Sequence, residues 1–189
     1  MPLDAETELS DDALMVLFAN GDAQAAHLLA QRHTSRVLAL SQRMLRDTAE
    51  AEDVAQEAMM RLWKIAPDWR QGEAKVSTWL YRVASNLCTD RLRRRRSTNL
   101  DAIPEPEDDA PSVEARMIET DRVTAVRNAI GDLPDRQRMA MTLRFLQEVP
   151  NPDIAEVMGL SVDAVESLLA RGKRALAAAL TSKRDSLGM

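Results

Sequence analysis

The sequence of 189 residues contains little cysteine and few aromatic side chains. Cys88 is the only cysteine, which excludes an intrachain disulfide and a cysteine-rich zinc site. Aromatic residues make up only 3% of the chain, whereas helix-favouring Ala, Leu, Arg and Glu are abundant. No apolar run approaches the roughly 20 residues that a membrane span requires. The acidic N-terminus lacks the cationic and apolar segments of a signal peptide, so we expect an all-α protein in the cytoplasm, with no membrane insertion.

The chain also lacks the residue groupings typical of enzymes. No nucleophile–base set, phosphate-binding loop or metal cluster is recognisable, so we expect no catalytic residues, no metal and no cofactor. His27 and His33 lie apart from any cysteine or paired-carboxylate motif, which favours surface or packing roles. We expect Cys88 to pack as a small apolar residue.

Lysine and arginine are missing from residues 1–30 and 97–115, where all the charge is acidic. The formal net charge is −5, but the cations collect at Arg91–Arg96 and again at Arg171–Arg174. Such local patches bear on nucleic-acid binding more directly than the overall sum does. The net charge therefore does not exclude a nucleic-acid partner.

The stretch Val76–Arg96 is the segment around which the chain is organised. Ser77 and Thr78 favour a helix N-cap, and apolar residues then recur at three- and four-residue steps. Its end holds more arginines than helix capping requires. The remaining surface offers groups that stack on bases or read their edges: Trp79, Tyr81, Arg82, Ser85, Asn86 and Asp90. Taken alone, the stretch is more typical of a buried helix with a solvated basic end, and only the rest of the chain favours the nucleic-acid interpretation.

Three helices are expected before this stretch. The first begins near Asp11, Asp22 caps the second, and the capping-box spacing after Asp47 opens the third. A loop over residues 66–75 follows, and its Trp69 is either a plug of the core or part of a contact surface. The polar face of the third helix carries Glu52, Asp53, Gln56 and Glu57.

After Arg96 the chain changes to prolines and carboxylates without apolar periodicity, which predicts a flexible acidic linker over residues 97–115. Ser112 is a candidate cap for a helix that reaches Ile130, and Pro134 precedes a further helix that ends near Leu146.

Residues 151–180 carry the most specific local pattern. Asn151 is placed to cap a short helix with Pro152 in its first position, Gly159 to make a left-handed turn, and Ser161 to cap the next helix. With small Ala155 and apolar residues at crossing positions, this pattern predicts a helix-turn-helix. Candidates for base edges are Ser161, Val162, Asp163, Glu166, Ser167 and Ala170, and candidates for phosphates are Arg171, Lys173 and Arg174. A helical hairpin that only packs is the alternative.

Both ends of the chain resemble one family. Residues 47–63 and 77–87 resemble region 2 of bacterial extracytoplasmic-function (ECF) sigma factors, a subfamily of the sigma-70-type RNA polymerase sigma factors. Residues from Leu133 to Leu176 resemble region 4 of the same proteins. The two matches cover most of the chain in the right order, with a linker of suitable length between them.

The resemblance implies a promoter-specificity subunit of RNA polymerase, with two small helical domains over residues 8–96 and 116–182. The acidic face Glu52, Asp53, Gln56 and Glu57 would bind core polymerase. The −35 element of the promoter DNA would meet the helix-turn-helix candidates given above, and an anti-sigma factor is the usual controlling partner. The −10 element would meet Asp68, Trp69, Arg70, Lys75, Trp79, Arg82, Ser85, Asn86, Asp90, Arg93 and Arg94.

The sequence departs from the family in its reading helix. Members often carry a basic residue where Glu166 stands, and Pro150 and Pro152 change the polar approach to the helix-turn-helix. Glu166 would accept a hydrogen bond from cytosine N4 or face an inhibitor instead. We therefore expect weak binding of the isolated region 4 domain to DNA.

Two other classes of protein compete with this interpretation. A stand-alone helix-turn-helix regulator explains residues 151–180 but gives no role to the acidic face Glu52–Glu57, and it binds duplex DNA without polymerase. A helical scaffold would show no salt-dependent promoter binding even with polymerase present.

Overall fold

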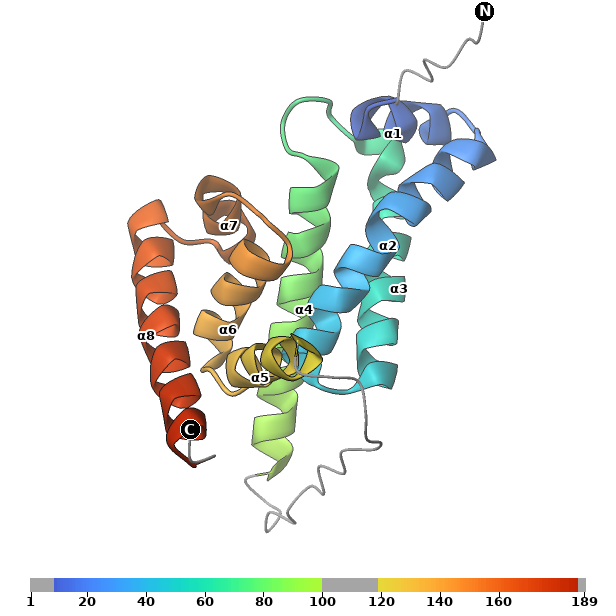
Figure 1. Cartoon of the computed structure of the whole chain (residues 1–189). Coiled ribbons are helices and arrows are strands. Elements are labelled where there is room, and N and C mark those ends of the chain that lie inside the picture. The colour runs from blue at the N-terminus through green and yellow to red at the C-terminus, as the bar shows by residue number, and fades with distance from the viewer. Residues whose placement is uncertain (1–8, 100–118, 187–189) are drawn as a thin grey trace, which may run out of the picture.

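The computed structural model describes residues 9–99 and 119–186, and all regular structure within these two ranges is helical, as the sequence predicts. Figure 1 shows an N-terminal group of helices packed beside a C-terminal group. The bounds are α1 Asp11–Ala19, α2 Ala23–Leu45, α3 Thr48–Ile65, a 3₁₀ turn Ala66–Asp68, α4 Val76–Asn99, α5 Glu119–Gly131, α6 Asp135–Met141, a π-type turn Thr142–Leu146, α7 Asn151–Met158 and α8 Val162–Ser186.

The N-terminal half is a bundle in which α2, α3 and α4 share one apolar core, with α1 across one end (Figure 1). Its fully buried side chains include Leu29, Leu40, Leu62 and Leu80, one or more from each long helix. Buried residues recur at steps of three or four along α2, α3 and α4, so each helix has one apolar face, and these faces meet in the core. The bundle therefore fixes the direction in which α3 and α4 present their polar faces.

Side-chain caps begin the second and third helices where the sequence predicts them. The Asp22 carboxylate accepts from the backbone N–H of Gln24 at 2.8 Å, and that of Asp47 accepts from Glu50 N–H at 2.9 Å. These bonds satisfy donors that have no partner inside the helix.

The start of α4 differs from the prediction. The helix begins at Val76, so Ser77 and Thr78 lie in its first turn instead of capping it. Val76 is 1% exposed and Thr78 is 3% exposed. The packing of these side chains places the helix start at Val76, one residue before Ser77, the first of the two expected capping residues. The helix also continues to Asn99, into the segment expected as linker. The rest of that segment, with Ser112, lies outside the described residues.

The C-terminal half contains the predicted helix-turn-helix in α7 and α8. Gly159 has φ +62°, the left-handed conformation that ends α7, and the Ser161 hydroxyl accepts from Ala164 N–H at 3.2 Å. Val165 is fully buried beneath the crossing. Asn151 is not the cap: Pro150 already has the extended backbone of a capping residue, with ψ 149°, so Asn151 is the first residue of α7.

Candidate nucleic-acid and protein interfaces

The polar face of α3 is a continuous exposed strip. Glu52, Asp53 and Gln56 are exposed and Glu57 is half-buried, while the intervening residues are buried. Met60 is 52% exposed and lies four residues after Gln56, on the same face. Sequence reasoning missed Met60, although this spacing was available to find it. An acidic strip that ends in an exposed methionine suits a basic protein surface with an apolar patch.

The residues expected at the −10 element line one side of the N-terminal half. They come from the 66–75 loop and from α4. Trp79 and Asp90 are half-buried, and Ser85 is buried. The exposed members are Asp68, Arg70, Lys75, Arg82, Asn86, Arg93 and Arg94. The exposed members on the loop and on α4 are therefore accessible to a partner, and Ser85 is not.

Trp69 packs against the core, one of the two alternatives left open by the sequence. Its ring is half-buried against the core and meets the Trp79 ring edge-on, with 6.1 Å between the ring centroids. Its indole N–H donates to Asp12 Oδ1 at 2.9 Å. The ring is thus held in place while the rest of the loop faces solvent.

The arginine run at the end of α4 divides into two kinds of residue. Arg91 donates to Glu50 O at 3.2 Å and Arg95 to Leu45 O at 2.9 Å, so both join α4 to the corner between α2 and α3. Arg93 and Arg94 are exposed, and Arg93 pairs with the neighbouring Asp90 at 2.8 Å. Arg96 is also exposed but pairs with Asp135, so Arg93 and Arg94 are the better candidates for phosphate contacts.

The two halves of the protein contact each other across the −10 candidates. Lys75 Nζ lies 2.7 Å from Asp153 Oδ2 on α7, and the Tyr81 hydroxyl donates to Gln147 Oε1 at 3.0 Å. Deeper in the contact, the Ser85 hydroxyl donates to Met139 Sδ at 3.2 Å, which explains why Ser85 is buried. In this arrangement Ser85 is not accessible to DNA.

The opposite end of the contact is held by three arginines. Arg46 pairs with Asp132 at 2.6 Å, Arg138 donates to Met44 O at 2.8 Å, and Arg96 pairs with Asp135. Each pair joins a residue before position 100 to one after position 130. The two halves are thus joined in a closed arrangement by polar contacts at both ends, in addition to buried apolar residues of both halves that belong to one cluster.

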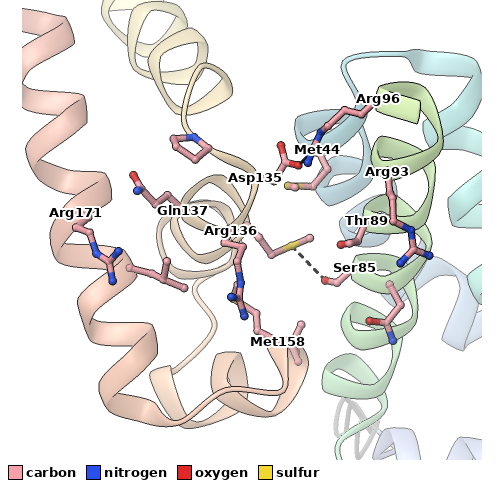
Figure 2. Close-up of a pocket in the computed structure, with 15 residues that line it drawn as sticks. Met44, Ser85, Thr89, Arg93, Arg96, Asp135, Arg136, Gln137, Met158 and Arg171 are labelled. Carbon is pink, nitrogen blue, oxygen red and sulfur yellow. Dashed lines mark hydrogen bonds and ion pairs between the residues drawn. The ribbon is translucent and has the colours of Figure 1, made fainter. Parts of the chain in front are cut away.

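A cavity of about 890 Å³ lies between these contacts (Figure 2). Figure 2 shows Ser85, Thr89 and Arg93 of α4 on one wall, facing the C-terminal half. The opposite side contributes Arg136 and Arg171. The apolar part of the lining is Met44, Pro134, Met139, Val157, Met158 and Leu168. The cavity therefore combines an apolar lining with a cationic rim that includes one carboxylate, Asp135.

The second candidate surface lies on α8 and extends from its solvent side to the cavity, where Arg171 belongs to the lining. Ser161 precedes the helix, and every predicted residue on it is exposed: Val162, Asp163, Glu166, Ser167, Ala170, Arg171, Lys173 and Arg174. Lys173 Nζ stands 5.2 Å from the centroid of the Phe145 ring, which is itself 46% exposed. The buried Val165 and Leu169 turn this face away from the core. The arrangement fits a reading helix with cations toward its middle.

The remaining chemistry-bearing residues have packing roles. Burial raises the pKa of the Cys88 thiol to about 11, so it stays protonated and unreactive at neutral pH. His33 is buried and its Nε2 lies 2.6 Å from Asp11 Oδ2. Within the described ranges, no group of three or more His, Cys, Asp or Glu side chains is arranged to hold a metal ion. No helix in those ranges has both the length and the apolarity to cross a bilayer.

Comparison with known proteins gives matches in both halves. Residues 29–98 match the family described as Sigma-70 region 2, and residues 124–176 match Sigma-70, region 4. The RNA polymerase sigma-H factor of Pseudomonas aeruginosa is 32% identical over 92% of this chain and 95% of its own length. The ECF RNA polymerase sigma factor SigM of Mycobacterium tuberculosis is 32% identical over 90% of this chain and 84% of its own length.

Solved structures share the fold. CnrH, solved in complex with the cytosolic domain of CnrY, is 25% identical with a TM-score of 0.68 and covers 91% of this chain and 97% of its own. The sigma factor RpoE of Bartonella quintana, solved with the anti-sigma factor NepR, is 18% identical with a TM-score of 0.67 over 82% of this chain and 96% of its own.

Proposed function

This chain belongs to the ECF group of the sigma-70 family of RNA polymerase sigma factors. We propose that separate exposed surfaces of the protein bind core polymerase, the −10 element and the −35 element. It is a transcription initiation factor that directs core polymerase to promoters. The observation that carries this conclusion is the pair of matches, region 2 followed by region 4, within one chain. We assign the region 2 domain to residues 8–96, the linker to 97–115 and the region 4 domain to 116–182. The protein works in the cytoplasm and has no catalytic activity of its own.

Reconstituted transcription tests the function directly. The purified chain is added to core polymerase and a library of promoter fragments, and transcripts are sequenced. Specific initiation that requires the chain supports the assignment. Binding to duplex DNA without polymerase, together with no stimulation of core enzyme, would instead indicate a stand-alone regulator.

We assign core-polymerase binding to the α3 strip of Glu52, Asp53, Gln56 and Glu57. A row of exposed carboxylates on a helix held by a buried opposite face is a rigid surface for a basic partner. Met60 adds an apolar contact at one end of the strip.

The first test of this surface is Asp53→Arg, which should lower the affinity for core polymerase at least about tenfold, because placing like charges together at an interface costs several kcal/mol. Affinity is measured by titration of labelled protein with core enzyme, after circular dichroism shows the fold intact. Glu148→Arg is the matched control, since Glu148 is exposed and lies in the C-terminal half. Equal affinity of the two variants would remove α3 from the interface.

We assign −10 recognition to the 66–75 loop and the exposed side of α4, with Asn86 as a base reader. The Asn86 side chain is exposed on the helix before the arginines, and its amide can bond a base edge. Arg93 and Arg94 are assigned to phosphates. Because Ser85 and Lys75 contact the C-terminal half, this role requires the halves to separate before DNA is engaged.

Asn86→Ala should reduce open-complex formation by about 1–3 kcal/mol, the value of a lost base contact, and only on promoters that carry the preferred base. Permanganate footprinting on a panel of −10 sequences measures the effect. A uniform loss across the panel would mean that Asn86 does not read a base.

Arg171→Ala is the comparison variant, because we assign Arg171 to a phosphate at the −35 element. It should weaken binding of the holoenzyme to a similar extent on most promoters. The slope of log affinity against log salt concentration should decrease by about one, the value for one lost phosphate contact. An unchanged salt slope would exclude the phosphate contact.

We propose that an anti-sigma factor binds across the two halves. CnrH, the 25% identical neighbour, was solved with the cytosolic domain of CnrY. In this chain, the cavity between α4 and α6 has an apolar lining and four arginines around it, Arg93, Arg96, Arg136 and Arg171. An amphipathic helix with an acidic side is the complementary ligand.

A further inference from the structure

The Asp12 carboxylate on α1 binds the loop between α3 and α4 at two points. Its Oδ1 accepts from Trp69 Nε1–H at 2.9 Å, and its Oδ2 accepts from the backbone N–H of Gly72 at 3.2 Å. Asp12 is separated from these two residues by 57 and 60 positions in the sequence. One side chain thus fixes both the aromatic residue and the turn of the loop.

Apart from the bond of Lys75 to Asp153 at the end of the loop, the other hydrogen bonds described for this loop are local. In the described structure, Trp69 N–H donates to Ala66 O at 3.2 Å and Glu73 N–H to Arg70 O at 3.4 Å. Arg70 and Glu73 also form an ion pair at 3.4 Å, between side chains that are 79% and 66% exposed. Gly72 has φ +79°, so the turn uses a conformation that only glycine adopts readily. Bonds this long and exposed do little to restrict residues 70–73. The Trp69 ring packs against the core and Trp79, and Asp12 adds the hydrogen bonds that fix the indole N–H and the turn at Gly72.

The helix that carries Asp12 is itself firmly attached. The neighbouring Asp11 lies 2.9 Å from Arg32 and 2.6 Å from His33 Nε2 on α2, and the hydrogen bond with His33 lowers the pKa of the Asp11 carboxyl. Leu14 and Met15 of α1 are fully buried. These contacts fix the Asp12 backbone relative to α2, so its carboxylate is a rigid point of attachment for the loop.

We propose that Asp12 is a positioning residue for −10 recognition: its carboxylate sets the conformation of the loop whose exposed Asp68 and Arg70 meet the opened DNA. The proposal rests on the −10 role assigned above to the loop. Asp12 touches no base in this scheme. It acts because a recognition loop must hold its geometry before the ligand arrives, and Asp12 binds both Trp69 and the turn at Gly72.

The test compares Asp12→Ala, Trp69→Phe and the double variant in complete holoenzyme on a panel of −10 sequences and a panel of −35 sequences. Trp69→Phe keeps an aromatic ring but removes the indole N–H. We expect Asp12→Ala to lower discrimination among −10 sequences about tenfold, comparable to one lost base contact, with −35 discrimination and core affinity unchanged. The double variant should lose less than the product of the single losses, because both changes break one hydrogen bond.

Asp11→Asn is the matched control, since Asp11 lies on the same helix as Asp12 but bonds Arg32 and His33 of α2 and not the loop. A loss of −10 discrimination in Asp12→Ala that exceeds the loss in Asp11→Asn at equal thermal stability supports the proposal. Equal losses would show that α1 acts only by general docking and would overturn it. Arg70→Ala tests the −10 assignment of the loop separately. If Arg70→Ala alters discrimination among −10 sequences and Asp12→Ala does not, the proposed role of Asp12 is wrong and the loop assignment stands. If neither variant alters −10 choice, both fall.

Discussion

Joining residues 75 and 153 covalently is expected to lower promoter opening on the order of 100-fold. In the closed arrangement Lys75 Nζ and Asp153 Oδ2 are 2.7 Å apart, and Ser85, buried at 5% exposure, contacts Met139. If the loop and α4 bind the −10 element as proposed above, this contact must open before they can receive DNA. If the link leaves about 1% of molecules open, the apparent affinity for opened DNA falls by the same factor.

The experiment uses Lys75→Cys with Asp153→Cys and a short bis-maleimide. Cys88 does not compete for the reagent, because it is fully buried and its pKa is raised to about 11. The linked protein is compared with the same double variant left unlinked, so the loss of the Lys75 cation is common to both. Core binding is measured in parallel. Equal promoter opening by the two forms would show that the closed arrangement does not limit DNA recognition.

Val165→Asp is expected to destabilise the helix-turn-helix by about 3–5 kcal/mol, the usual penalty for a buried charge without a partner. Val165 is 0% exposed at the crossing of α7 and α8, where a carboxylate has no access to water. Because the loss is local, we expect amides of α6 to α8 to exchange faster with deuterium while those of α2 and α3 keep their protection. Transcription that depends on the −35 element should be lost with it.

Val162→Asp is the matched control for this change. Val162 stands one turn earlier on the same helix and is 38% exposed, and an acidic residue in a first turn suits the helix dipole. Its exchange rates should stay close to those of the wild-type protein. Equal destabilisation by the two substitutions would contradict the burial of Val165 as the cause.

Local chemistry made much of the fold predictable. Asp22, Asp47, Gly159 and Ser161 begin or end helices through bonds to residues two to four positions away or through one backbone angle, so their roles follow from short patterns. The start of α4 was mistaken because the packing of Val76 outweighed the capping preference of Ser77. Asn151 failed as a cap because the backbone of Pro150 already supplied the extended conformation.

The sites were predictable only as sets of residue types. The face of α8 and the strip on α3 follow from helical spacing, and both are exposed as expected. The contact of Ser85 with Met139 joins positions 54 apart, and no periodicity encodes such a pair. The arginine run could not be divided from the sequence for the same reason. Arg95 bonds the corner between α2 and α3, whereas Arg93 bonds only its neighbour Asp90 among the described contacts, and this difference depends on where the other helices end.

The polar pairs between the halves also bear on energetics. Lys75 is 67% exposed in its pair with Asp153, and Arg46 and Asp132 are 49% and 72% exposed in theirs. Exposed pairs of this kind contribute about 0–1 kcal/mol each, less in salt. Apolar residues of both halves belong to one buried cluster, so these polar pairs add only a small, salt-sensitive part to the stability of the closed arrangement. We expect added salt to weaken that part and to shift the balance between closed and open forms toward the open ones.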